Sequence, residues 1–171
     1  MDGVGDMTVI QDAYPELNRD LRFFPLGVKD PSVLTREQIN HYNDMGYIAP
    51  IDLFDTHEIS EIRAYFDELL PKALSAGWNS YEITNWHKHC RGVWDIVTSS
   101  RLLDYVQDLL GETLIIRHSH FFAKLPGDGK RVSWHQDASY WPLSPSKVVS
   151  AWLAIDDADI GNGALQIIPR S

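Results

Sequence analysis

The stretch Trp-His-Gln-Asp at residues 134–137 holds the side chains best suited to chemistry in this sequence. It places the imidazole of His135 two residues before the carboxylate of Asp137. In an extended strand, residues i and i+2 point to the same face, so both groups can bind one metal ion from one side. One His and one carboxylate, with a second His from elsewhere, form the facial triad of non-haem Fe(II) oxygenases. The pattern therefore indicates an iron site with three positions open for a co-substrate and O₂.

The context of this pair leaves two readings open. The pair follows a Gly-rich turn at 126–129 and is flanked by Trp134 and Tyr140, which suits a site. On these residues alone, His135 is equally well explained as a polar residue satisfied on a sheet face. A second cluster, His87-x-His89-Cys90, lacks a partner pair at zinc-finger spacing and is a weaker candidate for a metal.

Helices are expected to precede the site. Capping-box patterns begin at Thr35 and Asp55, and Ser100 is expected to cap a third helix. After residue 112 the pattern changes to short runs of β-branched, aromatic and apolar residues separated by turns, which favour strands. The elements expected are three helices and five strands. The helices are expected over 35–44, from 55 to near Pro71 or the turn after it, and over 100–110. The strands are expected over 47–51, 114–125, 132–137, 148–155 and 165–168.

Helices followed by several short strands favour an α+β fold, with a jelly-roll-like core and the N-terminal helices packed outside it. We expect a single domain over 1–171, because no low-complexity tract or charge block marks a linker. Its parts would be an N-terminal arm (1–34), a helical part (35–111) and the first strands of the barrel (112–171). The arm is expected to pack on the body through three apolar residues, Leu21, Phe23 and Phe24.

Composition limits the partners. The net charge of −9 gives an acidic surface that repels phosphate backbones, so nucleic acid is not expected. Cys90 is the single cysteine, which excludes an intrachain disulfide and fits a reducing cytoplasm. The acidic start at 1–6 is unlike a signal peptide, and no apolar run approaches the roughly 18 residues of a membrane span. We expect a soluble, cytoplasmic protein; its oligomeric state is not specified by any pattern.

A wider series of motifs adds a resemblance. In order, the series includes His-Cys-Arg-Gly-Val-Trp-Asp at 89–95, His-Phe-Phe-Ala-Lys at 120–124, the metal motif, Ala-Trp-Leu-Ala-Ile-Asp at 151–156 and Asn-Gly-Ala-Leu at 162–165. From about residue 35 onward, this series closely resembles the phytanoyl-CoA dioxygenase family of Fe(II)/2-oxoglutarate oxygenases. The resemblance implies a double-stranded β-helix core, with Fe(II) as metal and 2-oxoglutarate as co-substrate.

The resemblance also implies roles for individual residues. His135 and Asp137 would be two of the three iron ligands. The co-substrate and the substrate would bind beside them. Residues implied near 2-oxoglutarate are Trp152, Gln136, Lys88 and His120, and those implied on the substrate side are Tyr140 and Trp141.

One departure from the family concerns the rest of the site. In the family, the distal iron His and the Arg that pairs with 2-oxoglutarate lie some tens of residues past the Asn-Gly-Ala segment, whereas this chain ends at Ser171. We therefore expect the natural protein to be longer, and this chain to carry only the first part of the barrel.

Asp137 indicates the type of reaction that the resemblance implies. Related halogenases carry a small residue at this position, so a carboxylate favours hydroxylation. The implied reaction hydroxylates an aliphatic C–H of a small organic substrate with O₂ and releases succinate and CO₂. An aromatic-rich site next to basic residues suits a small zwitterion. The chain also resembles the aminoalkylphosphonate hydroxylases of this family, which implies 2-aminoethylphosphonate or a related small zwitterion as substrate. The alternative is a non-catalytic jelly-roll module that binds a ligand or metal without turnover.

Overall fold

A computed structural model describes residues 13–81, 83–127, 129 and 131–171. The first twelve residues of the predicted arm, and Asp128 of the predicted turn, lie outside the described residues. The rest consists mainly of helices and extended chain. The helical elements are α1 (Arg36–Met45), α2 (Thr56–Ser75), η1 (Trp86–Lys88), α3 (Arg91–Val97), α4 (Ser100–Leu110) and η2 (Asp137–Tyr140), of which η1 and η2 are 3₁₀.

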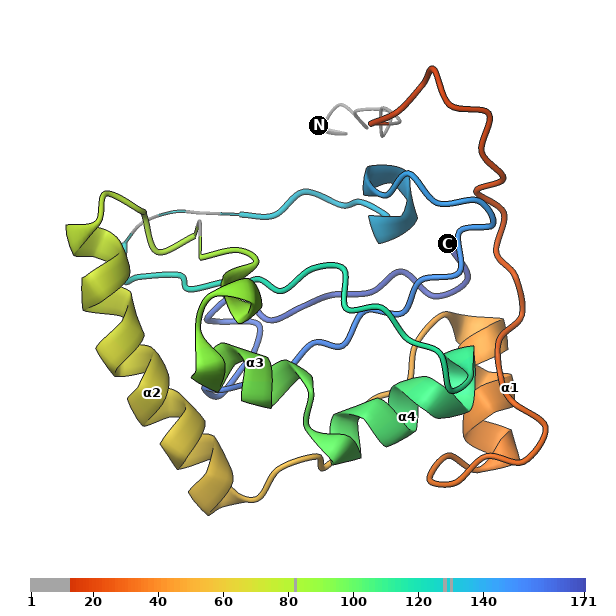
Figure 1. Ribbon diagram of the computed structural model, residues 1–171, viewed down its shortest axis with the longest axis horizontal. Coiled ribbons are helices and arrows are strands. Elements are labelled where there is room, and N and C mark those ends of the chain that lie inside the picture. Colours follow the sequence, from red (N-terminus) through yellow and green to blue (C-terminus); the bar gives the residue numbers. More distant parts are fainter. Residues whose placement is uncertain (1–12, 82, 128, 130) are drawn as a thin grey trace, which may run out of the picture.

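The α-helices and the later extended chain occupy different parts of the molecule. In Figure 1, α2, α3 and α4 follow one another along the left and lower edges, and α1 lies at the lower right. The chain after α4 runs back across the middle in long extended segments. The arm descends on the right, beside the loop that carries η2. The fold thus brings together residues as far apart in the sequence as Arg19 and Trp141, which are separated by 122 positions.

Both predicted capping boxes are confirmed. The Thr35 hydroxyl accepts a hydrogen bond from the N–H of Gln38, and the Gln38 side chain accepts one from the N–H of Thr35. Asp55 and Glu58 make the same reciprocal pair at the start of α2. Gly46 ends α1 with φ of 87°, a left-handed conformation that glycine adopts without steric cost.

The other helix boundaries lie close to the predictions. The helix α2 continues through Pro71 and ends at Ser75, in the turn after it, as predicted. The cap of α4 is Ser99, one residue before the predicted Ser100. The helix α3 was not predicted, because its seven residues are too few to show a clear helical period.

Two groups of buried side chains connect the helices. The first joins α2 to α3 and consists of Phe66, Leu69, Ala73, Ile83 and Val93. The second joins the arm, α1 and α4 through Leu34, Ile39 and Leu109. The helices therefore form the best-packed part of the described chain.

The arm does not attach through all the residues predicted for that role. Leu21 is 36% exposed and Phe23 is 56% exposed, so neither is a buried anchor. Leu26 and Leu34 pack against the second buried group instead. The backbone of the arm also pairs with α4, because Gly27 donates its N–H to the carbonyl of Leu109 at 2.9 Å.

The predicted strands do not form a sheet within the described residues. One isolated antiparallel bridge, between Thr84 and His120, is the β-pairing present there. The carbonyl of Ile83 accepts the N–H of Phe121 beside this bridge, at 3.1 Å. Strands form only when neighbouring backbones supply hydrogen bonds, and the segments after residue 112 lie extended without a ladder. The double-stranded β-helix is thus not confirmed in this part of the chain.

The carboxylate of Asp108 ties α4 to the end of the arm. It is 3% exposed and accepts backbone hydrogen bonds from Ser32 at 2.7 Å, Val33 at 2.8 Å and Leu34 at 2.7 Å. The Ser32 hydroxyl adds a fourth bond at 3.1 Å. Burial opposes the charged form of Asp108, but these hydrogen bonds outweigh it and hold the pKa below its ordinary value.

We expect Asp108→Asn to lower the free energy of unfolding by about 2–3 kcal/mol, because an amide cannot accept all of these bonds. Urea unfolding at neutral pH measures the change, with Asp104→Asn on the same helix as control. The pKa of Asp108 is lower in the folded state, so its contribution is complete above the unfolded pKa of about 3.9. This contribution is lost as the pH falls through the folded pKa. The difference in free energy of unfolding between the variant and the wild type should therefore become smaller in acid. Equal stability at neutral pH would contradict this role.

Candidate metal centre

The chain turns at the metal motif. Asp137 is the first residue of η2 and His135 lies just before it, so the predicted strand over 132–137 is wrong. The N–H and the hydroxyl of Ser139 both donate to the carbonyl of Gln136, at 3.2 and 2.8 Å. Asp and Ser are typical of turns, because their side chains bond to nearby backbone. This local preference replaces the expected strand with a 3₁₀ turn.

The two predicted ligands nevertheless converge. The Nε2 atom of His135 lies 3.3 Å from Oδ1 of Asp137. Two donors on adjacent positions of an ion with bonds of about 2.1 Å lie about 3 Å apart. The side chains of His135 and Asp137 are 30% and 42% exposed, so an ion can reach both. One nitrogen donor and one carboxylate in this arrangement fit a divalent ion such as Fe(II).

Each of these side chains has a hydrogen-bond partner that orients it. The carbonyl of Ser133 lies 2.8 Å from Nδ1 of His135. Because a carbonyl only accepts, this contact places the proton on Nδ1 and leaves the lone pair on Nε2. The hydroxyl of Ser150 donates to Oδ2 of Asp137. Such outer partners are characteristic of metal ligands, since they fix the side chains that bind the ion.

A third ligand is not found in the part of the chain that the structure describes. No group of three or more His, Cys, Asp or Glu side chains is placed there to hold a metal ion. His118 lies close enough for its pKa to be raised by the charge of Asp137. Larger effects, of which burial is the largest, lower the pKa of His118 overall and favour the neutral imidazole.

One aromatic ring lies beside the pair, and a second lies against His118 and Arg117. The ring centroid of Tyr140 lies 5.6 Å from that of His135. The ring of Trp141 lies 5.3 Å from that of His118, and the Arg117 guanidinium sits 5.0 Å from its centroid. The structure therefore places Tyr140 beside His135 and Trp141 beside His118. Their role on the substrate side stays a prediction.

The residues proposed for 2-oxoglutarate are more scattered. His120 stacks on Phe122, with centroids 4.0 Å apart, and its Nε2 bonds to the carbonyl of Tyr81 at 2.6 Å. Its ring centroid lies 6.0 Å from that of His118. Trp152 is 47% exposed and lies two residues after Ser150. Gln136 is exposed beside the two ligands.

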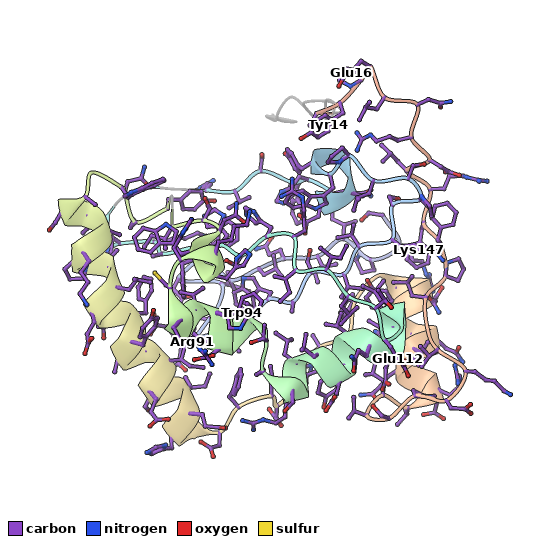
Figure 2. The ribbon with its side chains drawn as sticks, viewed as in Figure 1. Tyr14, Glu16, Arg91, Trp94, Glu112 and Lys147 are labelled. Carbon is purple, nitrogen blue, oxygen red and sulfur yellow. The ribbon has the colours of Figure 1, made fainter. Side chains whose placement is uncertain are left out.

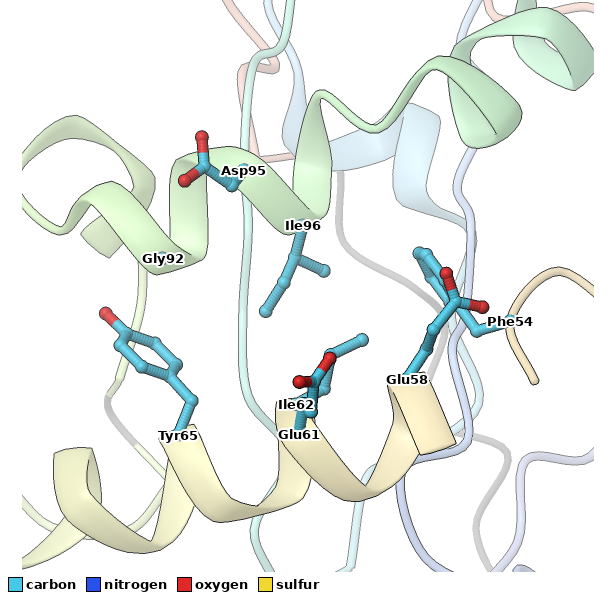
Figure 3. A pocket seen from close by; sticks show the side chains of 8 residues that line it. All are labelled: Phe54, Glu58, Glu61, Ile62, Tyr65, Gly92, Asp95 and Ile96. Atoms are coloured by element: carbon cyan, nitrogen blue, oxygen red, sulfur yellow. The ribbon is translucent and has the colours of Figure 1, made fainter. Parts of the chain in front are cut away.

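Lys88 lies at a different hollow. This hollow, of about 330 Å³, is otherwise lined by His87, His89, Cys90, Arg91 and Trp94. Figure 2 shows Arg91 and Trp94 on α3, away from η2. Another hollow, of about 290 Å³, lies between α2 and α3, and Figure 3 shows its acidic rim of Glu58, Glu61 and Asp95. Neither hollow is lined by His135 or Asp137.

The sequence analysis missed two residues with contacts in the region of the candidate site. Ser150 is 13 positions from Asp137, and a serine in an apolar run carries no signal of its role. Arg117 precedes His118 in a segment predicted as a strand, where alternation places neighbouring side chains on opposite faces. Only the folded chain shows that Ser150 contacts Asp137, and that Arg117 and His118 both contact the ring of Trp141.

Comparison with known proteins identifies the family. The family model described as Phytanoyl-CoA dioxygenase (PhyH) matches residues 42–171. The chain therefore belongs to the phytanoyl-CoA dioxygenase family, and the family implies a cupin-like fold.

No helix among the described residues is both long and apolar enough to cross a membrane.

The individual relatives are distant. The chain is similar to the peroxisomal phytanoyl-CoA dioxygenase of Bos taurus, with 28% identity over 82% of this chain and 48% of the relative. It is also similar to a probable alpha-ketoglutarate-dependent hypophosphite dioxygenase of Stutzerimonas stutzeri, with 23% identity over 79% of this chain and 52% of the relative. The chain thus spans about half the length of these relatives. No solved structure matches it significantly.

We expect Ser150→Ala to raise the dissociation constant of Fe(II) about 10-fold in the full-length protein, because Asp137 loses the donor that orients it. The change is measured by titrating the protein with Co(II) in place of Fe(II) and following the visible absorption of the bound Co(II). Ser133→Ala is the matched control, because it keeps the backbone carbonyl that contacts His135. Equal weakening in both variants would assign the effect to a general disturbance of the loop.

Proposed function

We propose that the full-length protein is an Fe(II)/2-oxoglutarate-dependent dioxygenase that hydroxylates an aliphatic C–H of a small organic substrate. One oxygen atom of O₂ enters the new hydroxyl group and the other enters succinate, while 2-oxoglutarate loses CO₂. The observation that carries the proposal is the 3.3 Å approach of His135 Nε2 to Asp137 Oδ1 in a chain of this family. Relatives named as dioxygenases support the class of reaction.

The described residues would have different roles around the metal ion. His135 and Asp137 would hold Fe(II), which when bound supplies the activation of O₂. The carbonyl of Ser133 keeps the His135 lone pair directed outward, and the Ser150 hydroxyl holds the carboxylate of Asp137. We further propose that the third ligand comes from residues beyond those described here, and that Gln136, Trp152, Lys88 and His120 serve the co-substrate.

The surroundings of the pair suit a small zwitterion, and 2-aminoethylphosphonate is our candidate. The Arg117 guanidinium forms no salt bridge with any carboxylate among the described residues, so it is available to an anionic group. The ring of Tyr140 is 46% exposed beside His135 and can receive an ammonium group on its face. The relative from Stutzerimonas stutzeri is named for hypophosphite, a small phosphorus anion, which favours this substrate class. We also propose a cytoplasmic location, supported by the single cysteine.

Replacing the metal ligand tests the proposal directly. The full-length protein is supplied with Fe(II), 2-oxoglutarate and O₂. His135→Ala should then reduce succinate formation by at least about 100-fold, because losing a metal ligand lowers activity more than losing a residue that only hydrogen-bonds to a ligand. His57→Ala, an exposed position on α2, should leave the rate unchanged. Wild-type protein that binds the metal but releases no succinate would favour the non-catalytic module.

Arg117→Gln tests the substrate class. It should raise the KM for 2-aminoethylphosphonate by about 10- to 100-fold, the effect of losing one hydrogen bond to a charged group. Succinate release in the absence of substrate should not change. Arg101→Gln is the control, because Arg101 pairs with Glu58 on the surface of α4. Failure of 2-aminoethylphosphonate to stimulate succinate release in the wild type would rule out this candidate.

A further inference from the structure

The N-terminal arm lies against the loop that carries the metal pair. The N–H of Asp20 donates to the hydroxyl of Ser144 at 3.3 Å, and the hydroxyl of Ser146 donates to the carbonyl of Arg22 at 3.4 Å. The family match begins at residue 42, so this part of the arm lies outside it. The loop is thus contacted by a segment that the family resemblance does not explain.

Arg19 makes the most extensive of these contacts. Its Nη1 donates to the carbonyls of Ala138, at 3.3 Å, and of Trp141, and its Nη2 donates to the carbonyl of Ser139 at 3.3 Å. The guanidinium also lies 5.3 Å from the ring centroid of Tyr14. One side chain of the arm therefore donates hydrogen bonds to three backbone carbonyls at the end of η2.

These three carbonyls belong to the C-terminal end of η2 and its cap. The last carbonyls of a helix have no partner within the helix, and their partial negative charge favours a cation. A planar guanidinium with five donors can satisfy several of them together, whereas an ammonium group cannot match this fork. The carbonyls of Ala138 and Trp141 also accept the N–H groups of Trp141 and Leu143, so Arg19 adds a charged donor to them and to the carbonyl of Ser139.

Fixing the end of η2 also fixes the groups that it presents. Asp137 is the first residue of η2, and Tyr140 is the last. Ser139 between them is 7% exposed and bonds back to Gln136, so hydrogen bonds within the turn connect its residues. A displacement of this turn changes the approach of Asp137 to His135, on which binding of one ion depends.

We propose that Arg19 is a positioning residue of the metal centre: it holds η2 so that Asp137 and His135 converge on one ion. The proposal rests on the function proposed above and adds a residue from the N-terminal arm to that site. Arg19 acts only through the backbone of residues 138–141 and does not touch the ion.

The test uses Arg19→Gln, Arg19→Lys and Arg22→Gln in the full-length protein. Co(II) titration with its visible absorption, succinate formation and urea unfolding are measured for each. Arg19→Gln should raise the dissociation constant of Co(II) about 10-fold and alter its absorption spectrum. Arg19→Lys should recover part of the affinity, because its charge remains but its fork is lost. Arg22→Gln should match the wild type, because the Arg22 side chain pairs with Asp20 and is 81% exposed.

The outcomes separate the two proposals. Suppose that the wild type forms succinate and that Arg19→Gln binds Co(II) with the same affinity and the same spectrum as the wild type. This result would overturn the positioning role of Arg19 and leave the proposed function intact. A lowered unfolding midpoint with unchanged Co(II) binding would also overturn it, since Arg19 would then only hold the arm. If Arg19→Gln does not fold, Arg19→Lys decides: several-fold weaker binding supports the role and unchanged binding overturns it. A wild type that neither binds Co(II) nor forms succinate overturns both proposals.

Discussion

The candidate metal centre depends on the orientation of one short turn, η2. Asp137 begins this turn, and the approach of its carboxylate to His135 exists only while the turn keeps its direction. Four residues cannot hold such a direction alone, because a 3₁₀ turn leaves its terminal carbonyls without internal partners. The turn is therefore held from outside, by the hydroxyl of Ser150 at its start and by the guanidinium of Arg19 at its end.

The N-terminal arm connects this turn to the helical part of the chain. Near its start it contacts η2 through Arg19, and near its end the buried carboxylate of Asp108 receives the backbone of residues 32–34. Both attachments combine a charged side chain with backbone groups of the opposite polarity, a stronger arrangement than a neutral hydrogen bond. The arm thereby links α4 to the metal motif, although few of its own apolar side chains are buried.

The helical and extended parts of the chain meet different requirements. A helix satisfies its own backbone, so α1, α2 and α4 form with the caps that local residues supply. A strand needs a neighbour, and the segments after residue 112 lack the ladder that the cupin-like family fold requires. Their apolar side chains show the consequence, since Ile115 is 87% exposed and Ile160 is 91% exposed. Burial of such residues would come with the partner strands of a complete barrel.

The sequence by itself determined the features that act over three or four residues. These include the capping boxes at Thr35 and Asp55, the glycine that ends α1 and the spacing of His135 and Asp137. Even there, it predicted a strand where the bond from the Ser139 hydroxyl to the carbonyl of Gln136 favours a turn. The tertiary structure decided which distant groups complete the site. Arg19 and Trp141 are 122 residues apart, and Ser150 and Asp137 are 13 apart, so no local period relates them. Such contacts form because polar groups need hydrogen-bond partners, and these partners come together only when the arm packs against the extended chain in the folded molecule.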